Sequence, residues 1–211
     1  MKTIKEIEKV FNKDNTNIAE ELREVVIKNN LNYNMSAFFE TETHLHIHKV
    51  ALFSLIIAKE LKLKKEDMIL LKQIAPLHDI GKLLIPNEIL SKPSKLTKAE
   101  FDVIKNHANL GYEILKDCTH KSLKLASLIA LEHHEKFDGT GYPMGMKGEE
   151  THLYSRIIAL ADVIESLASV RCYKKAWKKE DVRKLVEEQS GKHFDPVIAA
   201  AALKNFDKFF E

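Results

Sequence analysis

The residues best suited to chemistry begin with His78-Asp79, followed one turn later by Lys82, at the end of a mainly apolar run over residues 68–77. Burial removes the hydration of an imidazole and a carboxylate, which is unfavourable unless other interactions replace it. A metal ion supplies such interactions through coordinate bonds. The pair therefore predicts a metal site, whose remaining ligands must come from elsewhere in the chain.

Further candidate ligands lie on helix faces that are otherwise apolar. On a helix expected over residues 35–61, His46 is in line with the apolar stripe and Glu42 lies one turn before it, because residues four apart share a helix face. His44 and His48 fall on the opposite side, where we expect them to face solvent. Taken alone, a histidine such as His46 is more often a hydrogen-bonded core residue than a ligand.

The second half of the chain adds four candidates, His107, His133, His134 and Asp162. Each is expected at or near an apolar helix face, and a carboxylate is seldom buried without a partner. A loop over residues 137–148 follows the paired histidines and holds four of the seven glycines. That density predicts turns with positive φ, or a backbone that approaches another group closely.

Together these side chains are difficult to explain without metal. Helical bundles build metal sites from inward side chains on facing helices. Nitrogen and oxygen donors favour iron or manganese, permit zinc, cobalt or nickel, and disfavour iron–sulfur clusters and Cu(I). The donors are too many for one ion and suit two or three, with Asp79 able to bridge a pair. The full set is Glu42, His46, His78, Asp79, His107, His133, His134 and Asp162.

The elements that must position these residues are all expected to be helices, and the chain shows no strand alternation or internal repeat. Besides residues 35–61, helices are predicted over residues 2–12, 16–29, 65–77, 97–116, 120–135 and 179–190, and from Ser155 and Pro196 onward. A Thr97/Glu100 capping box and Asp195-Pro196 mark two of the starts. The buried face of the 97–116 helix is expected to hold Phe101, Ile104, His107, Leu110 or Gly111, and Ile114. We predict an all-α fold around one core.

Composition narrows the class of protein. The chain has 211 residues, 45% hydrophobic and 30% charged, as in ordinary globular proteins. Its apolar stretches are too short to span a membrane, and the N-terminus, which is amphipathic and carries acidic residues, does not resemble a signal peptide. Two cysteines give no disulfide framework, which favours a reduced, cytoplasmic setting. A net charge of +2 is too small to indicate binding to a nucleic acid polymer.

The motif from His78 to Lys82, the later His107 and the run HHEKFDGTGYP from His133 to Pro143 resemble the signature of the HD-GYP branch of the HD phosphohydrolase superfamily. A bare His-Asp pair is a weak signal, but the full set in this order is specific. The resemblance covers residues 42–196. It implies an HD-domain helical bundle with additional C-terminal helices and a Gly-rich GYP loop, over residues 35–211. Residues 1–34 would form a helical connector or cap.

The resemblance also implies roles for individual residues. Six would ligate metal, namely His78, Asp79, His107, His133, His134 and Asp162, with Asp79 bridging two ions. The pair Glu42 and His46 resembles the version of the family that holds a third metal.

Other residues would bind substrate according to the same resemblance. Lys82 would contact the scissile phosphate, and Arg171 and Lys174 would hold the phosphates of the dinucleotide. Tyr142 belongs to the GYP loop, which in the family borders the substrate and has been linked to contacts with diguanylate cyclase domains.

The activity implied by the resemblance is hydrolysis of cyclic dinucleotides, chiefly cyclic di-GMP, with two or three divalent metal ions. The expected reaction is in-line attack of a metal-bridging hydroxide on a 3′–5′ phosphodiester, giving pGpG and possibly GMP. Diguanylate cyclase (GGDEF) domains or an upstream regulatory domain are the expected protein partners.

Three other interpretations stay open. The chain could be a generic HD hydrolase of mononucleotides or deoxynucleoside triphosphates, against which the complete GYP loop argues. It could be a cyclic-dinucleotide sensor or cyclase-docking module without turnover, although every candidate ligand is present. A bundle with coincidental histidines would bury eight ionisable groups at a high cost. Three positions depart from the family pattern: Lys49 stands where Arg is usual, Cys172 where Pro is usual, and Glu165 where Asp is common. These departures concern substrate fit and packing.

Overall fold

The computed structural model describes residues 16–29, 44–170 and 175–211. Within these ranges every named element is a helix, apart from an isolated bridge between Ser190 and Phe194, so the predicted all-α fold is confirmed. The α-helices are α2 (Thr16–Lys28), α4 (His44–Glu60), α5 (Lys65–Ile74), α6 (Asn87–Leu90), α7 (Lys98–Lys105), α8 (His107–Leu115), α9 (Lys121–Glu132), α10 (Leu153–Ala168), α11 (Lys179–Gln189) and α12 (Pro196–Lys204). Short 3₁₀ helices are η3 (Ala75–Leu77), η4 (Ile80–Leu84), η5 (Gly148–Glu150) and η6 (Phe206–Phe209).

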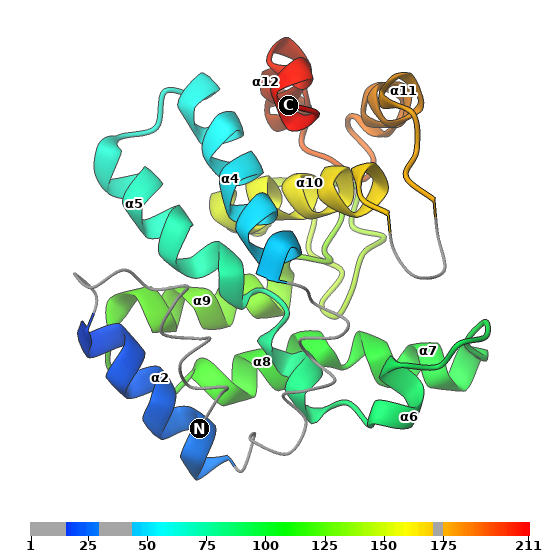
Figure 1. Cartoon of the computed structure of the whole chain (residues 1–211). Coiled ribbons are helices and arrows are strands. Elements are labelled where there is room, and N and C mark those ends of the chain that lie inside the picture. Colours follow the sequence, from blue (N-terminus) through cyan, green and yellow to red (C-terminus); the bar gives the residue numbers. More distant parts are fainter. Residues whose placement is uncertain (1–15, 30–43, 171–174) are drawn as a thin grey trace.

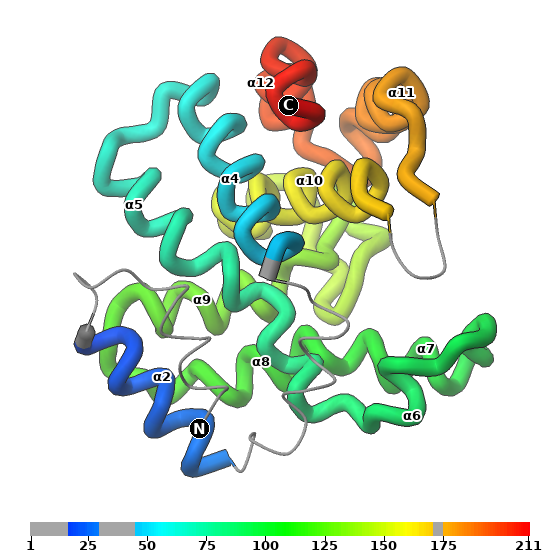
Figure 2. Tube along the Cα trace, in the orientation of Figure 1, coloured from blue at the N-terminus to red at the C-terminus, as the bar shows by residue number. Residues whose placement is uncertain are grey.

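The helices surround a centre at which α4 crosses α10 (Figure 1). Helix α5 returns antiparallel to α4 (Figure 1) and contacts α9, and α8 packs along both α9 and η4. Following the tube in Figure 2, α11 and α12 lie together beyond α10, whereas α2 lies against the opposite end beside α9. Helices α6 and α7 project from the body (Figure 1). The segments that carry the predicted ligands therefore meet near the middle of the molecule.

A single contiguous apolar core extends from α2 to η6. In α2 the side chains of Ile18, Leu22 and Val26 are buried at a four-residue spacing, which places the apolar stripe of this helix inside the core. The division of the chain at residue 34 stays a prediction, because residues 30–43 lie outside the described ranges.

Two helix starts follow the signals predicted from the sequence. The Thr97 hydroxyl accepts from the Glu100 amide at 3.2 Å and the Glu100 carboxylate accepts from the Thr97 amide at 2.8 Å, so the capping box is confirmed. Asp195 Oδ1 accepts from the Val197 amide at 2.8 Å at the start of α12. Gly191, at φ +78°, follows the end of α11, as a left-handed residue commonly does.

The predicted helix over residues 97–116 is wrong as a single helix, because it breaks at Asn106 into α7 and α8. Helix α8 packs closely on η4: a Cβ on Gly81 would lie 1.9 Å from the His107 carbonyl oxygen. Helix α7 instead leaves the body, so the periodicity of one helix does not continue across the break. Phe101 is consequently 50% exposed, whereas His107, Gly111 and Ile114 are buried as expected.

The end of one other helix differs from the prediction: α9 ends at Glu132, which makes His133 its C-cap rather than its last turn. The predicted 65–77 helix loosens in its last turn, as expected from Pro76 within it. Helix α5 ends at Ile74 and continues as η3, where Pro76 has no amide hydrogen to donate to a further helical turn. Among the helices that the structure describes, none is both long enough and apolar enough to cross a bilayer.

Candidate metal centre

The structure brings seven of the eight predicted ligands together in two adjoining clusters. One contains Asp79, His107, His133 and His134, and the other contains His46, His78 and Asp162. In each cluster the candidate donor atoms all lie within 4.8 Å of one another. They come from α4, the junction of η3 and η4, the start of α8, the end of α9 and α10. The eighth predicted ligand, Glu42, lies outside the described residues.

The first cluster forms around one oxygen of Asp79. Its Oδ1 lies 3.1 Å from His107 Nε2 and 3.5 Å from His133 Nε2. His107 Nε2 in turn lies 3.1 Å from His134 Nε2 and 3.3 Å from His133 Nε2. Two ligands at right angles on an ion at about 2.1 Å are themselves about 3 Å apart, so these separations suit coordination of a common ion.

The protonation of three imidazoles follows from their backbone contacts. The Nδ1 atoms of His78, His107 and His133 lie 2.8, 2.6 and 3.0 Å from the carbonyl oxygens three residues earlier. A carbonyl oxygen can only accept, so each Nδ1 carries the hydrogen, and in the neutral ring Nε2 is left with a lone pair. The lone pairs of His107 and His133 face each other at short distance, which is unfavourable unless a cation lies between them.

The second cluster has a similar arrangement around Asp162. Its Oδ1 lies 3.5 Å from His46 Nε2 and 4.0 Å from His78 Nε2. Both imidazoles are buried, and the Asp162 side chain is 19% exposed. Behind His46, the Nδ1 atom contacts the Glu165 carboxylate, which also accepts a hydrogen bond of 2.5 Å from the Ser169 hydroxyl.

Asp79 lies between the two clusters. While Oδ1 faces His107 and His133, Oδ2 lies 3.2 Å from His78 Nε2 of the second cluster. Among the described residues, Asp79 Oδ1 and His78 Nε2 have no hydrogen-bond partner although both are buried. Buried polar atoms without partners are rare in native proteins, and divalent ions would satisfy these two. The two clusters therefore fit divalent metal binding.

The local charges favour the protonation states that metal binding requires. Burial opposes ionisation of Asp79, but the charges of Lys82 and His78 hold its pKa well below the usual range. The Lys82 Nζ atom lies 2.7 Å from Asp79 Oδ2. Burial, together with His133 and His107, places the pKa of His134 well below its usual value, and burial also lowers that of His133. A charged carboxylate beside neutral imidazoles is the ligand state that metals need.

His78 behaves differently from the other imidazoles. Burial lowers its pKa, but the negative charges of Asp79 and Asp162 outweigh that effect, so the pKa of His78 is raised. The same two carboxylates that attract a proton to this ring would attract a metal cation.

The GYP loop packs directly on the first cluster. A Cβ on Gly141 would lie 2.3 Å from the Lys136 amide nitrogen, so the close approach of this backbone requires glycine. The Tyr142 amide donates to the His134 carbonyl at 3.2 Å, and the two rings stack with centroids 4.7 Å apart. Lys82 and Tyr142 thus lie at the first cluster, whereas Arg171 and Lys174 lie outside the described residues.

Three buried carboxylates beside the clusters were not predicted as parts of the site. Glu135 accepts from the amides of residues 144–146, and Glu132 accepts from the His152 amide and the Ser155 hydroxyl. Glu165 contacts His46. Their positions in the sequence could have indicated that they lie near the site, since Glu132 and Glu135 flank the paired histidines and Glu165 lies one turn after Asp162.

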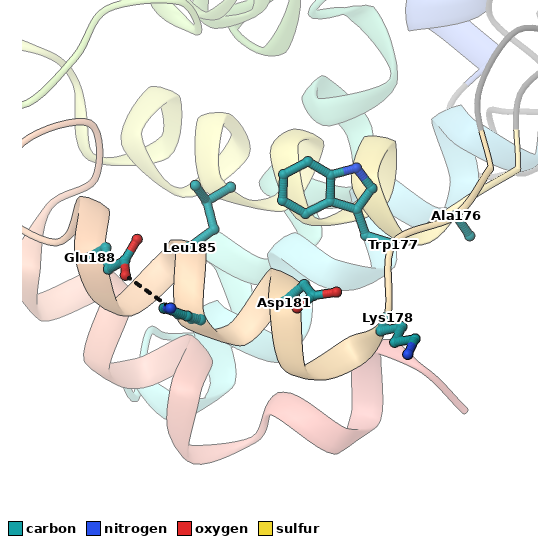
Figure 3. Close-up of a pocket in the computed structure, with 7 residues that line it drawn as sticks. Ala176, Trp177, Lys178, Asp181, Leu185 and Glu188 are labelled. Carbon is teal, nitrogen blue, oxygen red and sulfur yellow. Dashed lines mark ion pairs between the residues drawn. The ribbon is translucent and has the colours of Figure 1, made fainter.

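A surface hollow elsewhere on the molecule is separate from these clusters. Figure 3 shows its lining, in which Lys184 and Glu188 form an ion pair of 3.8 Å. The lining residues are Ala176, Trp177, Lys178, Asp181, Lys184, Leu185 and Glu188. They include no imidazole and no predicted ligand, so the hollow is not part of the candidate site.

Curated relatives are similar to this chain over most of its length. The chain is 40% identical over 169 residues to the cyclic di-GMP phosphodiesterase response regulator RpfG of Xanthomonas campestris pv. campestris, covering 80% of this chain and 43% of that protein. It is 36% identical over 199 residues to 3′3′-cGAMP-specific phosphodiesterase 2 of Vibrio cholerae, covering 93% of this chain and 38% of that protein. The chain thus spans less than half the length of these relatives.

Solved structures share the fold at low sequence identity. Bd1817, an HDGYP protein from Bdellovibrio bacteriovorus, matches with a TM-score of 0.61 and 16% identity, over 96% of this chain and 77% of that one. The HD domain of the Listeria monocytogenes phosphodiesterase PgpH matches with a TM-score of 0.56 and 16% identity, over 82% of this chain and 95% of that one. The HD domain family itself matches over residues 25–198. The chain belongs to the HD domain family, in agreement with the prediction from its HD-GYP motifs.

Proposed function

We propose that this chain is a metal-dependent phosphodiesterase of cyclic dinucleotides, with cyclic di-GMP as its principal substrate. The observation that carries this function is the position of Asp79, whose two oxygens face two separate imidazole clusters. A bridging carboxylate between two ions suits hydrolysis of a phosphodiester, because paired ions stabilise both the attacking and the leaving oxygen. Relatives named as cyclic di-GMP phosphodiesterases support the choice of substrate.

The residues that would hold the ions follow from the clusters. His107, His133 and His134 would bind one ion, His46, His78 and Asp162 a second, and Asp79 would bridge them. Such nitrogen and oxygen donors support iron or manganese. A third ion would need Glu42 in addition. Ions bound there would acidify a water molecule and polarise phosphoryl oxygens.

The remaining residues would orient the substrate. The Lys82 ammonium beside Asp79 would contact the scissile phosphate and stabilise its developing charge. Arg171 and Lys174 would hold the other phosphates of the dinucleotide, and Tyr142, stacked on His134, would border the substrate. The products would be pGpG and possibly GMP.

The proposal also covers the domain organisation of the chain and its location in the cell. Because the chain spans less than half of its curated relatives, residues 35–211 would act as a catalytic domain controlled by an upstream regulatory domain or by a GGDEF domain. The sequence shows no disulfide framework, which supports the cytoplasm as its location.

A second substrate deserves testing, since several relatives are named as specific for 3′3′-cGAMP. Both molecules contain two 3′–5′ phosphodiesters and differ in one base. The metal clusters would treat them alike, so discrimination would depend on contacts with the bases.

The test is a turnover assay on protein purified without oxygen. We expect bound iron or manganese and conversion of cyclic di-GMP to pGpG or GMP, with 3′3′-cGAMP and cyclic di-AMP in parallel. Asp79→Ala should lose bound metal and lower turnover at least 100-fold, because it removes the ligand shared by both clusters. Metal and dinucleotide binding without product would instead identify a sensor. Full turnover by Asp79→Ala would contradict the proposed chemistry.

A further inference from the structure

The group that contacts Nδ1 of His46 differs in kind from the groups that contact Nδ1 of three other histidines of the site. The Nδ1 atoms of His78, His107 and His133 face backbone carbonyl oxygens. The Nδ1 atom of His46 instead contacts a carboxylate oxygen, Oε2 of Glu165. A carboxylate carries a full negative charge, so it is the stronger acceptor for an imidazole N–H.

Glu165 is itself held in place. Its side chain is buried in α10, with a residue exposure of 1%, and its second oxygen accepts a hydrogen bond of 2.5 Å from the Ser169 hydroxyl one turn later. Asp162 lies one turn earlier on the same helix, so α10 presents a direct metal-ligand candidate and a supporting carboxylate on one face. His46, on α4, lies against both carboxylates.

We propose that Glu165 is a positioning residue for metal binding, which acts through His46. Its carboxylate keeps the hydrogen of His46 on Nδ1, directs the Nε2 lone pair toward Asp162 and His78, and increases the basicity of the ring. Carboxylates behind metal-binding histidines act in this way in other proteins. The inference depends on the proposed metal centre and adds to it a residue that does not ligate metal.

The length of the side chain is important for this role. Aspartate is shorter than glutamate by one methylene, or about 1.5 Å. From the same Cα, an aspartate carboxylate would not reach His46 Nδ1 in this arrangement. Glu165→Asp should therefore weaken the contact while keeping the charge, and Glu165→Gln should remove the charge while keeping the length.

The test measures metal retention rather than activity. Wild type, Glu165→Gln and Glu165→Asp are loaded with Mn²⁺, titrated with a competing chelator, and assayed for bound metal per chain. We expect Glu165→Gln to lose one ion at a chelator concentration 10- to 100-fold lower than wild type, which is the usual effect of removing such a partner. The ion at the His107 cluster should stay, and Glu165→Asp should be intermediate.

Two comparisons separate positioning from a general loss of structure. Asp195→Asn, the matched control, also neutralises a buried carboxylate. Asp195 is the N-cap of α12, pairs with Arg156 and belongs to neither cluster, so this variant should keep wild-type metal affinity. In a His46→Ala background, Glu165→Gln should cause no further loss of metal, because its effect requires the imidazole.

The possible results have distinct meanings. Wild-type affinity in Glu165→Gln, an equal loss in Asp195→Asn, or a full additional loss in the His46→Ala background would each overturn the role of Glu165 and leave the metal centre intact. A wild-type chain that binds no Mn²⁺ or Fe²⁺ would overturn the proposed function and this inference together.

Discussion

At the level of single residues, three of the candidate donors, Asp79, His133 and His134, have pKa values shifted toward the protonation state that metal binding needs. Asp79 is ionised because Lys82 and His78 outweigh the effect of burial on its pKa. His133 and His134 are neutral because burial and neighbouring imidazoles lower their pKa values. Metal binding at neutral pH would therefore release few protons from these residues, and acidification would weaken it once the imidazoles become protonated.

Lys82 provides the sharpest test at the residue level. It lies at the cluster without being a metal donor, and its ammonium is 2.7 Å from Asp79 Oδ2. We expect Lys82→Ala to keep bound metal at the wild-type level while kcat falls about 100-fold or more, because a charge that stabilises the phosphoryl oxygens is lost. Elemental analysis and steady-state kinetics on the same preparation give the two measurements. Lys82→Arg, which keeps the charge, should retain more activity, and a parallel loss of metal would show that Lys82 instead stabilises the ligand set.

At the level of elements, the ligands occur where helices end or break. His78 follows η3, His107 is the first residue of α8, directly after α7, and His133 is the C-cap of α9. Each of these histidines donates its Nδ1 hydrogen to the carbonyl oxygen three residues earlier, in the helical turn just before it. The secondary structure thus fixes the tautomers and turns each Nε2 toward the centre.

These helix ends also mark the limit of what the sequence could predict. Residue types and motif order identified seven side chains that do converge, from His46 to Asp162. Periodicity could not show the break at Asn106 or the end of α9 at Glu132, because both depend on contacts between distant segments, such as Gly81 against α8. The contact between Glu165 and His46, 119 residues apart in sequence, also exists only in the folded chain.

The GYP loop gives the prediction that belongs to this level. Glu135, buried directly after His134, accepts hydrogen bonds of 2.6, 3.1 and 3.0 Å from the amides of residues 144–146. We expect Glu135→Gln to lower the free energy of unfolding by about 1–3 kcal/mol, because hydrogen bonds to a charged group are exchanged for weaker ones. Urea denaturation measures this change, and turnover should fall as the loop detaches from His134.

Glu149→Gln is the matched control for the loop. Glu149 is exposed in the same region, in η5, and its replacement should change the free energy of unfolding by less than about 0.5 kcal/mol. Equal stability of the two variants would mean that Glu135 does not anchor the loop.

At the level of the whole molecule, the structure assigns a packing role to a segment whose role the sequence left open. Residues 1–34 were expected to form a connector or a cap. Within the described part, α2 contributes Leu22 to the core and lies against α9. Glu21 accepts from the His120 amide at 3.0 Å, just before α9 begins. Since His133 is the C-cap of α9, the packing of α2 supports the helix that positions the first cluster.

Truncation of Leu22 tests this support. The side chain is 0% exposed, so Leu22→Ala should lower the free energy of unfolding by about 2–5 kcal/mol through lost burial and a residual cavity. Ile27→Ala removes an apolar side chain from the same helix at a position that is 54% exposed, and should cost less than about 0.5 kcal/mol. Urea denaturation of the whole chain, followed by far-UV circular dichroism, compares the two. If α2 is only a connector, the variants will unfold at the same urea concentration as wild type. If it is part of the core, Leu22→Ala alone will shift the single unfolding transition of the entire domain.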